Sequence, residues 1–192
     1  MRSASITRQT KETDVKIELN LDSMGYQIDI PAGFLKHMLE LFSMHSGIGL
    51  DVKAKGDIYV DLHHITEDIG IVMGLALKDA LGEKQGIARY GFAKIPMDEA
   101  LVEACMDLSN RPFFQIHGGD LFHGKVGDFD LELLPEFFRS VAFKAGITLH
   151  ITIYSSGNKH HLAEACFKAF AYALKEAVRI VGEDIPSTKA KL

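Results

Sequence analysis

Two short motifs contain the residue types best suited to binding a metal ion. HHITE (residues 63–67) and HHLAE (160–164) each place two adjacent histidines and a glutamate at positions i, i+1 and i+4. The first histidines, His63 and His160, are 97 residues apart, about half of the chain. The same offset aligns ALKDA (76–80) with ALKEA (173–177). Ligand residues that recur at a fixed offset, each followed by a similar helical segment, predict a duplicated unit and a two-metal site.

The spacing within each motif has a geometric consequence if the motif begins a helix. Residues i and i+4 lie on one helix face, so His63 and Glu67 can converge on one ion, while His64 points elsewhere. The second motif has the same geometry with His160, Glu164 and His161. Four imidazoles and two carboxylates suit manganese, iron, zinc or nickel, and the lack of candidate thiolate ligands disfavours a structural zinc site. One such motif could equally be a helix cap, but two at equivalent places favour metal binding.

Several other residues could complete such a site or bind an anion. His37 and His45 lie eight residues apart, near one face of a predicted helix, and Glu136 stands where the second half should match His37. A carboxylate can replace an imidazole as a ligand. Arginine forks, an ammonium group and hydroxyls suit a phosphate. The candidates for that role are Arg89, Arg111, Lys168, Ser187, Thr188 and Lys189, although each taken singly is typical of a surface position.

The elements that must position these residues follow from hydrophobic periodicity. Alternation predicts strands at 15–21 and 26–30 as one hairpin and at 49–54 and 57–62 as another, and helical spacing predicts helices near 34–42 and from His63. The second half shows strands near 100–108, 112–116 and 147–155, with helices at 131–146 and 160–181. We therefore predict an α+β fold with an internal duplication of a β-β-α-β-β-α unit. It would form a single compact domain of two pseudo-repeats (about 1–92 and 93–192), with two four-stranded sheets that each carry two helices on one face.

Composition narrows the classes of function. The chain has 192 residues, 47% of them hydrophobic, and a net charge of −5, so no basic surface indicates nucleic-acid binding. Cys105 and Cys166 lie in apolar runs, which is typical of buried free thiols in a reducing compartment. Neither a signal peptide nor an apolar run of membrane-spanning length is visible. These features predict a soluble cytoplasmic protein without nucleic-acid or membrane partners.

Longer segments around these motifs resemble a known family. TRQTKET, GFLKHML, DLHHITEDIGI, DLSNRPF, GNKHHLAEACFKAFAYALKEA and PSTK occur in this order along nearly the whole chain. Together they resemble imidazoleglycerol-phosphate dehydratase, an enzyme family of histidine biosynthesis. The resemblance implies a duplicated α+β fold, a dinuclear manganese site, with two Mn²⁺, built between subunits, and a homo-oligomer of twenty-four copies.

The resemblance also implies roles for individual residues. The implied metal ligands are His37, His63, His64, Glu67, His160, His161 and Glu164, with Glu136 where the family often has a histidine. The implied substrate contacts are Glu12, His45, Arg89, Arg111, Lys168, Ser187, Thr188 and Lys189. The implied catalytic groups are Glu12, Glu67, Glu164 and His45.

The implied reaction removes water from imidazoleglycerol phosphate, a small phosphorylated imidazole, to give imidazoleacetol phosphate. The proton lost from carbon is not acidic, so metals that bind the imidazolate form of the substrate would help to expel the ring-adjacent hydroxyl. A carboxylate must also shuttle a proton, and Glu12 is our candidate because it lies outside both metal motifs. Two other functions fit the residues alone: a dinuclear metallohydrolase acting on a small phosphate ester, and a metal-storage or assembly protein.

Overall fold

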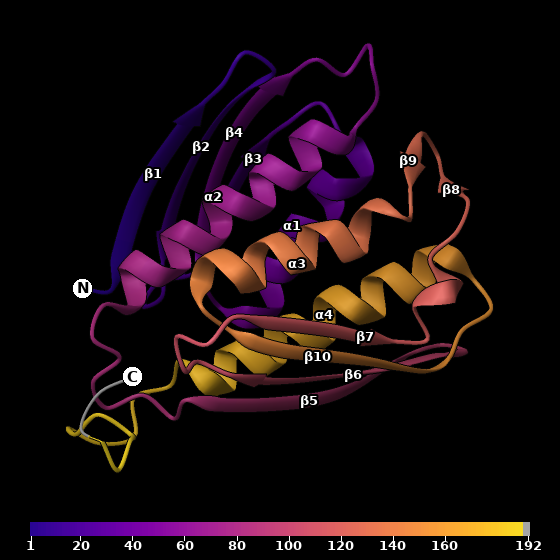
Figure 1. Cartoon of the computed structure of the whole chain (residues 1–192). Helices are drawn as coiled ribbons and strands as arrows, with labels where there is room; N and C mark the ends of the chain where they lie inside the picture. Colours follow the sequence, from indigo (N-terminus) through magenta and orange to yellow (C-terminus); the bar gives the residue numbers. More distant parts are fainter. Residues whose placement is uncertain (190–192) are drawn as a thin grey trace.

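The chain folds as two repeats that share one order of elements. In a computed structural model, which describes residues 1–189, each repeat contains three strands, a helix, a strand and a helix (Figure 1). The first repeat consists of β1 (Ser3–Gln9), β2 (Thr13–Asn20), β3 (Tyr26–Asp29), α1 (Gly33–Ser46), β4 (Gly49–Gly56) and α2 (His63–Leu81). The second consists of β5 (Tyr90–Met97), β6 (Ala100–Asp107), β7 (Phe113–His117), α3 (Leu133–Ala145), β10 (Thr148–Ser155) and α4 (Lys159–Ala177). A short insertion of η1 (Gly119–Leu121), β8 (Lys125–Val126) and β9 (Phe129–Asp130) precedes α3.

The two sheets have equivalent topologies. The first has the strand order β1-β2-β4-β3 and the second has the order β5-β6-β10-β7. In each sheet the first three strands in this order are antiparallel, and the last strand pairs in parallel with its neighbour. The predicted α+β class, the two four-stranded sheets and the internal duplication are therefore confirmed.

The helices lie between the two sheets, where α2 packs against α3 and α1 packs against α4 (Figure 1). Glycines permit the α2–α3 contact, because a Cβ on Gly70 or Gly74 would lie 2.8 Å or 2.7 Å from a backbone oxygen of α3. Buried aromatic rings fill the other contact, with Phe42 of α1 stacked on Phe170 of α4 at 5.7 Å. Both motifs with adjacent histidines lie at helix starts, and α2 and α4 begin at the same end of the molecule (Figure 1).

The predicted order β-β-α-β-β-α is wrong in one respect, since each repeat is β-β-β-α-β-α. Residues 57–62 form a turn rather than a strand, and Ile58, Tyr59 and Val60 are consecutive exposed apolar residues without amphipathic alternation. The predicted hairpins are also wrong, because β4 lies between β2 and β3. β1 and β5 were not predicted. β1 is an edge strand in which only alternate residues are half-buried, so its hydrophobic pattern is weak.

The length of α4 gives the distance between the two ends of the molecule that this helix connects. α4 places His160 in its first turn and Ala177 at its last residue. At 1.5 Å per residue these two residues are about 26 Å apart along the helix axis. Within the described part of the chain, no helix has the length and apolar character needed to cross a membrane.

Candidate active site

A three-residue group of potential metal ligands lies where α1 meets the start of α4. The ligand atoms of His37, His160 and Glu164 all lie within 4.8 Å of one another. The Nε2 atoms of His37 and His160 are 3.2 Å and 3.7 Å from Glu164 Oε1. Two imidazoles and a carboxylate at this separation fit a divalent transition metal. The predicted convergence of His160 and Glu164, with His37 from another helix, is therefore seen in the structure.

Glu164 is a buried carboxylate held between these imidazoles and a cation. Lys168, one turn further along α4, donates a hydrogen bond to Glu164 Oε2 at 3.1 Å and also contacts Met97 Sδ at 3.4 Å. Burial alone would raise the pKa of Glu164, but the hydrogen bond and charge of Lys168 outweigh it and lower the pKa below its ordinary value. The carboxylate is therefore ionised and available as a ligand at neutral pH.

The second histidine of this motif faces a different pair of carboxylates. The rings of His160 and His161 are nearly perpendicular, at 83°, and the two side chains contact different carboxylates. His161 Nδ1 is 2.9 Å from Glu99 Oε2, and its Nε2 is 3.8 Å from Asp98 Oδ2. The hydrogen bond with Glu99 raises the pKa of His161, and the same bond is the main reason that the pKa of Glu99 falls to about 2. A carboxylate on Nδ1 orients an imidazole so that Nε2 can bind a metal.

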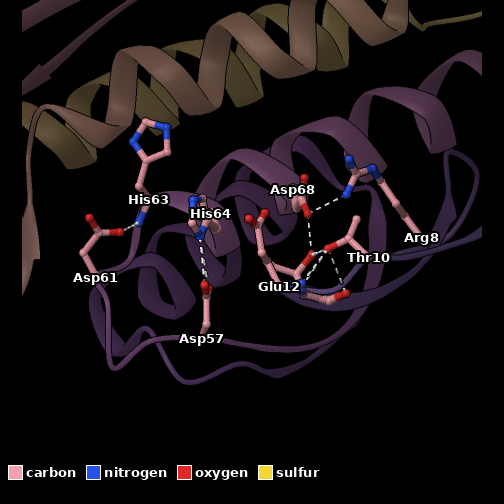
Figure 2. A network of polar contacts seen from close by, with 9 residues as sticks. Arg8, Thr10, Glu12, Asp57, Asp61, His63, His64 and Asp68 are labelled. Atoms are coloured by element: carbon pink, nitrogen blue, oxygen red, sulfur yellow. Dashed lines mark hydrogen bonds and ion pairs between the residues drawn. The ribbon is translucent and has the colours of Figure 1, made fainter.

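The first motif repeats this arrangement with other carboxylates. The rings of His63 and His64 cross at 89°, and His64 Nδ1 is 3.0 Å from Asp57 Oδ2 (Figure 2). The backbone N–H of His63 donates to Asp61 Oδ1 at 2.7 Å. The hydrogen bond with Asp57 raises the pKa of His64. The turn that was predicted as a strand thus supplies both carboxylates that hold the start of α2.

The remaining two predicted ligands face a cation rather than a histidine. Glu136 of α3 forms a hydrogen-bonded ion pair with Arg139, whose Nη2 is also 3.9 Å from Glu67 Oε1. His63, His64, Glu67 and Glu136 are not among the close ligand groups within residues 1–189. The assignment of all eight residues as metal ligands stays a prediction, and Arg139 would have to move for Glu136 to bind a metal.

Glu12 lies in the turn between β1 and β2, beside the start of α2 (Figure 2). Hydrogen bonds from Arg8 and Thr13 to Asp68 tie this turn to α2, the first at 2.5 Å. The Glu12 side chain is exposed, and within residues 1–189 its carboxylate accepts no hydrogen bond. Its charge adds to that of Asp57 in raising the pKa of His64. A free carboxylate beside a metal-ligand candidate is placed to move a proton.

His45 lies further along α1 than His37 and faces the same neighbouring helix. Its Nδ1 is 3.2 Å from the Tyr172 hydroxyl of α4. Burial, followed by the charge of Lys168, lowers the pKa of His45. A neutral imidazole beside a tyrosine hydroxyl can donate a hydrogen bond to a polar substrate or accept one from it.

All the predicted phosphate residues except Lys168 gather in one pocket at the opposite end of the molecule, whereas Lys168 lies at the metal end, on Glu164. A pocket of about 730 Å³ is lined by Arg89, Ser109, Asn110, Arg111, Pro186, Ser187, Thr188 and Lys189. Asp107 accepts hydrogen bonds from Arg89 at 2.7 Å and from Arg111 at 3.4 Å. Arg89 also donates to the Pro186 carbonyl at 2.8 Å, which holds the tail against the pocket. We call this group the anion pocket.

Some residues that shape both regions were not predicted from the sequence. Asp57, Asp107 and Tyr172 each contact a predicted site residue, and Glu99 contacts the predicted ligand His161. Asp57 and Asp61 precede the first motif closely enough to have been noticed. Asp107 and Glu99 contact residues that are distant in the sequence, Arg89 and His161, and no local spacing indicates such contacts.

Comparison with known proteins agrees with this geometry. The family model described as imidazoleglycerol-phosphate dehydratase matches residues 31–174. The chain belongs to the imidazoleglycerol-phosphate dehydratase family. Imidazoleglycerol-phosphate dehydratases are hydro-lyases of histidine biosynthesis, and the match includes both motifs with adjacent histidines.

Individual members of the family match over almost their full length. The imidazoleglycerol-phosphate dehydratase of Thermodesulfovibrio yellowstonii is 49% identical over 98% of each chain. That of Methanosarcina mazei is 48% identical over 100% of each chain. The crystal structure from Staphylococcus aureus has a TM-score of 0.83 and 40% identity, and covers 93% of this chain and 99% of its own. The structure from Pyrococcus furiosus, in complex with (S)-C348, has a TM-score of 0.85, 36% identity and coverage of 97% and 100%.

Proposed function

We propose that this chain dehydrates imidazoleglycerol phosphate to imidazoleacetol phosphate at a site with two Mn²⁺ ions, shared between copies of the chain. The observation that carries the proposal is the pairing of a preassembled imidazole–carboxylate group with a separate anion pocket. The first would hold the metals that bind the imidazole ring, and the second would hold the phosphate. A metallohydrolase or a metal-storage protein would not explain membership of the dehydratase family.

The ligand residues fit a pair of metals in two ways. His37, His160 and Glu164 already lie at ligand separation. His64 and His161 each have a carboxylate on Nδ1, which fixes the tautomer that leaves Nε2 free. His63, Glu67 and Glu136 would complete the set of eight. When bound, the metals would act as Lewis acids that favour loss of a ring proton and position the substrate.

Residues of the chain itself would perform the remaining steps. Arg89, Arg111 and Lys189 would bind the phosphate, with hydroxyl donors from Ser187 and Thr188. Lys168 and His45 would donate hydrogen bonds to the polar middle of the substrate. Glu12 would take the proton from carbon and return one to the departing hydroxyl. Within residues 1–189 its carboxylate accepts no hydrogen bond, and it lies beside His64. Glu67 and Glu164 would act as ligands that bring the reacting groups together.

The distance between the two regions favours a site made by more than one copy. The anion pocket lies at the C-terminal end of α4, because the Arg89 N–H donates to the Ala177 carbonyl at 2.9 Å. His160 lies at the other end, about 26 Å along the helix. An imidazole and a phosphate joined by a glycerol chain are much closer together than this. A homo-oligomer, such as the predicted 24-mer, would bring the metal end of one copy to the anion pocket of another.

The test is an assay of imidazoleacetol phosphate formation by metal-stripped and manganese-restored protein. We expect no product from the stripped protein and full recovery with manganese. A protein that hydrolyses phosphate esters without forming imidazoleacetol phosphate would contradict the proposal. So would turnover that is unaffected by complete metal removal.

A further inference from the structure

A lysine outside the predicted site lies buried behind the anion pocket. Lys84 follows α2 and is only 1% exposed, which is exceptional for a lysine. Its Nζ donates hydrogen bonds to the Leu108 carbonyl at 3.0 Å and to Asn110 Oδ1 at 2.7 Å. Both partners belong to the turn between β6 and β7, immediately before Arg111. The buried ammonium therefore fixes the backbone that presents a phosphate-binding arginine.

The backbone on both sides of this contact is held in an unusual conformation. Lys84, Arg89 and Asn110 all have positive φ angles, of 59°, 72° and 58°. Such angles are unfavourable for residues other than glycine and persist only where contacts hold them. The Leu108 N–H donates to the Arg89 carbonyl at 3.1 Å, so the two strained segments are joined. The Lys84 side chain links the end of the first repeat to the turn between β6 and β7.

The local charges also favour an anion. Arg89, Arg111 and Lys189 line the pocket and Lys84 lies behind it, whereas Asp107 is the carboxylate among them. Burying an ammonium group is unfavourable unless hydrogen bonds and an opposite charge compensate for the lost hydration. Burial is the main reason that the pKa of Lys84 falls to about 8, and Asp107 acts in the opposite direction. An anion in the pocket would stabilise the protonated lysine.

We propose that Lys84 is a positioning residue of the anion pocket, which holds the turn carrying Arg111 and adds its positive charge behind the bound phosphate. The inference rests on the proposed function, because it assumes that this pocket binds the substrate phosphate. It can nevertheless be tested with inorganic phosphate alone, which does not require any turnover.

The first experiment measures binding of inorganic phosphate by calorimetry to the wild-type protein and to Lys84→Met. Methionine keeps the length of the side chain but removes the charge and both hydrogen bonds. We expect the dissociation constant to rise by roughly tenfold or more, which is typical of losing hydrogen bonds from a charged group. Lys78→Met is the matched control, since Lys78 is an exposed lysine of α2 that also acts on the charge of Lys84, and its affinity should stay within about twofold.

The second experiment uses pH and does not depend on whether Lys84→Met folds. Relative to Lys84→Arg, wild-type affinity for phosphate should fall between pH 7 and 9 as Lys84 loses its proton, because burial lowers the pKa of Lys84 to about 8. Lys84→Arg is the reference because its guanidinium remains charged over this range, and the ionisation of the phosphate itself affects both proteins alike. The other charged groups that face Lys84 are Asp107, Arg89 and Lys78, and both proteins contain them.

The outcomes separate this inference from the proposed function. A folded Lys84→Met with unchanged phosphate affinity, or a wild-type affinity that follows that of Lys84→Arg between pH 7 and 9, would overturn the role of Lys84. Absence of phosphate binding in the wild type would overturn it too. Phosphate binding that follows the expected pattern without any dehydratase turnover would support Lys84 and reject the proposed function. In an active enzyme, Lys84→Met should raise KM and leave kcat within about threefold.

Discussion

The two repeats place a glutamate at the same position and surround it differently. Glu12 is the last residue before β2, and Glu99 is the last residue before β6, the equivalent strand. Glu99 accepts hydrogen bonds from the backbone N–H groups of Gly157 and Asn158 and also binds His161. Glu12 has no such partners among the described residues and lies beside His64, the equivalent of His161. Duplication thus supplied two carboxylates, one of which holds a histidine while the other is free.

Another residue explains why Glu12 is free. In the first repeat the turn before α2 contains Asp57, which binds His64 Nδ1 in place of Glu12. The N–H of Asp57 in turn donates to the Glu12 carbonyl at 3.1 Å. The carboxylate of Glu12 is therefore not needed to orient a ligand. In our proposal, Glu12 can act as the proton carrier because Asp57 has taken over the structural contact.

The largest expected effect comes from Glu12→Gln. The amide keeps size and polarity but cannot act as a base, so turnover should fall by roughly 10²–10⁴-fold while metal content and assembly survive. The measurement is kcat for a variant shown to be fully metallated. Near-normal turnover would reject Glu12 as the proton carrier and would make the two glutamates alike in lacking a chemical role.

Glu99→Gln should affect metal binding instead of chemistry. Loss of the carboxylate on His161 Nδ1 should weaken metal affinity by about 10–100-fold, as is usual for such supporting contacts. Turnover should recover when excess manganese is added. Metal titration followed by kcat at saturation checks this, and a defect that manganese cannot repair would contradict the structural role of Glu99.

Arg111→Ala and Lys189→Ala test the other end of the molecule. Both residues should bind phosphate equally in the ground and transition states, so KM should rise and kcat should hold. Each lost charge-assisted contact should cost about 1.5–3 kcal/mol. Arg179→Ala is the control, because Arg179 is exposed and pairs with Glu176. A fall in kcat at constant KM would mean that these residues do not simply hold the phosphate.

Removal of the metal should also change the assembly. The predicted ligands come from all four helices and, in our proposal, from more than one copy, so metal binding is linked to association. Light scattering after chelation should show a smaller particle, and manganese should restore the original mass. An unchanged mass after complete metal removal would show that the metals do not join the copies.

The sequence was most informative where function depends on local spacing. The two motifs with adjacent histidines predicted helix starts and side chains that point apart, which follow from helical periodicity, and their recurrence 97 residues apart predicted the duplication. β5 is an edge strand that packs closely against α4. It was missed because Gly91 interrupts its apolar pattern. A Cβ on Gly91 would lie 1.8 Å from the Ala173 carbonyl, so this glycine permits α4 to approach the sheet. Such a requirement is set by tertiary contact and has no local signature.

The residues that contact the site residues could not be predicted from local sequence patterns either. Lys84 was not singled out because a lysine after a helix is usually solvated, and only its contacts with the β6–β7 turn reveal its burial. The separation between the histidine motifs and the anion pocket also required the fold. In the sequence the PSTK segment follows the second motif by little more than the length of one helix, and that helix separates them in space.

In the proposed assembly, each active site combines the metal end of one copy with the anion pocket of another. Glu12→Gln and the double variant Arg111→Ala/Lys189→Ala can be stripped of metal, mixed and reassembled with manganese, then assayed at low substrate concentration. Our account predicts that mixed particles are far more active than the two variants assembled separately, because some sites then contain an intact Glu12 and an intact anion pocket. Activity no greater than the sum of the separate variants would contradict it.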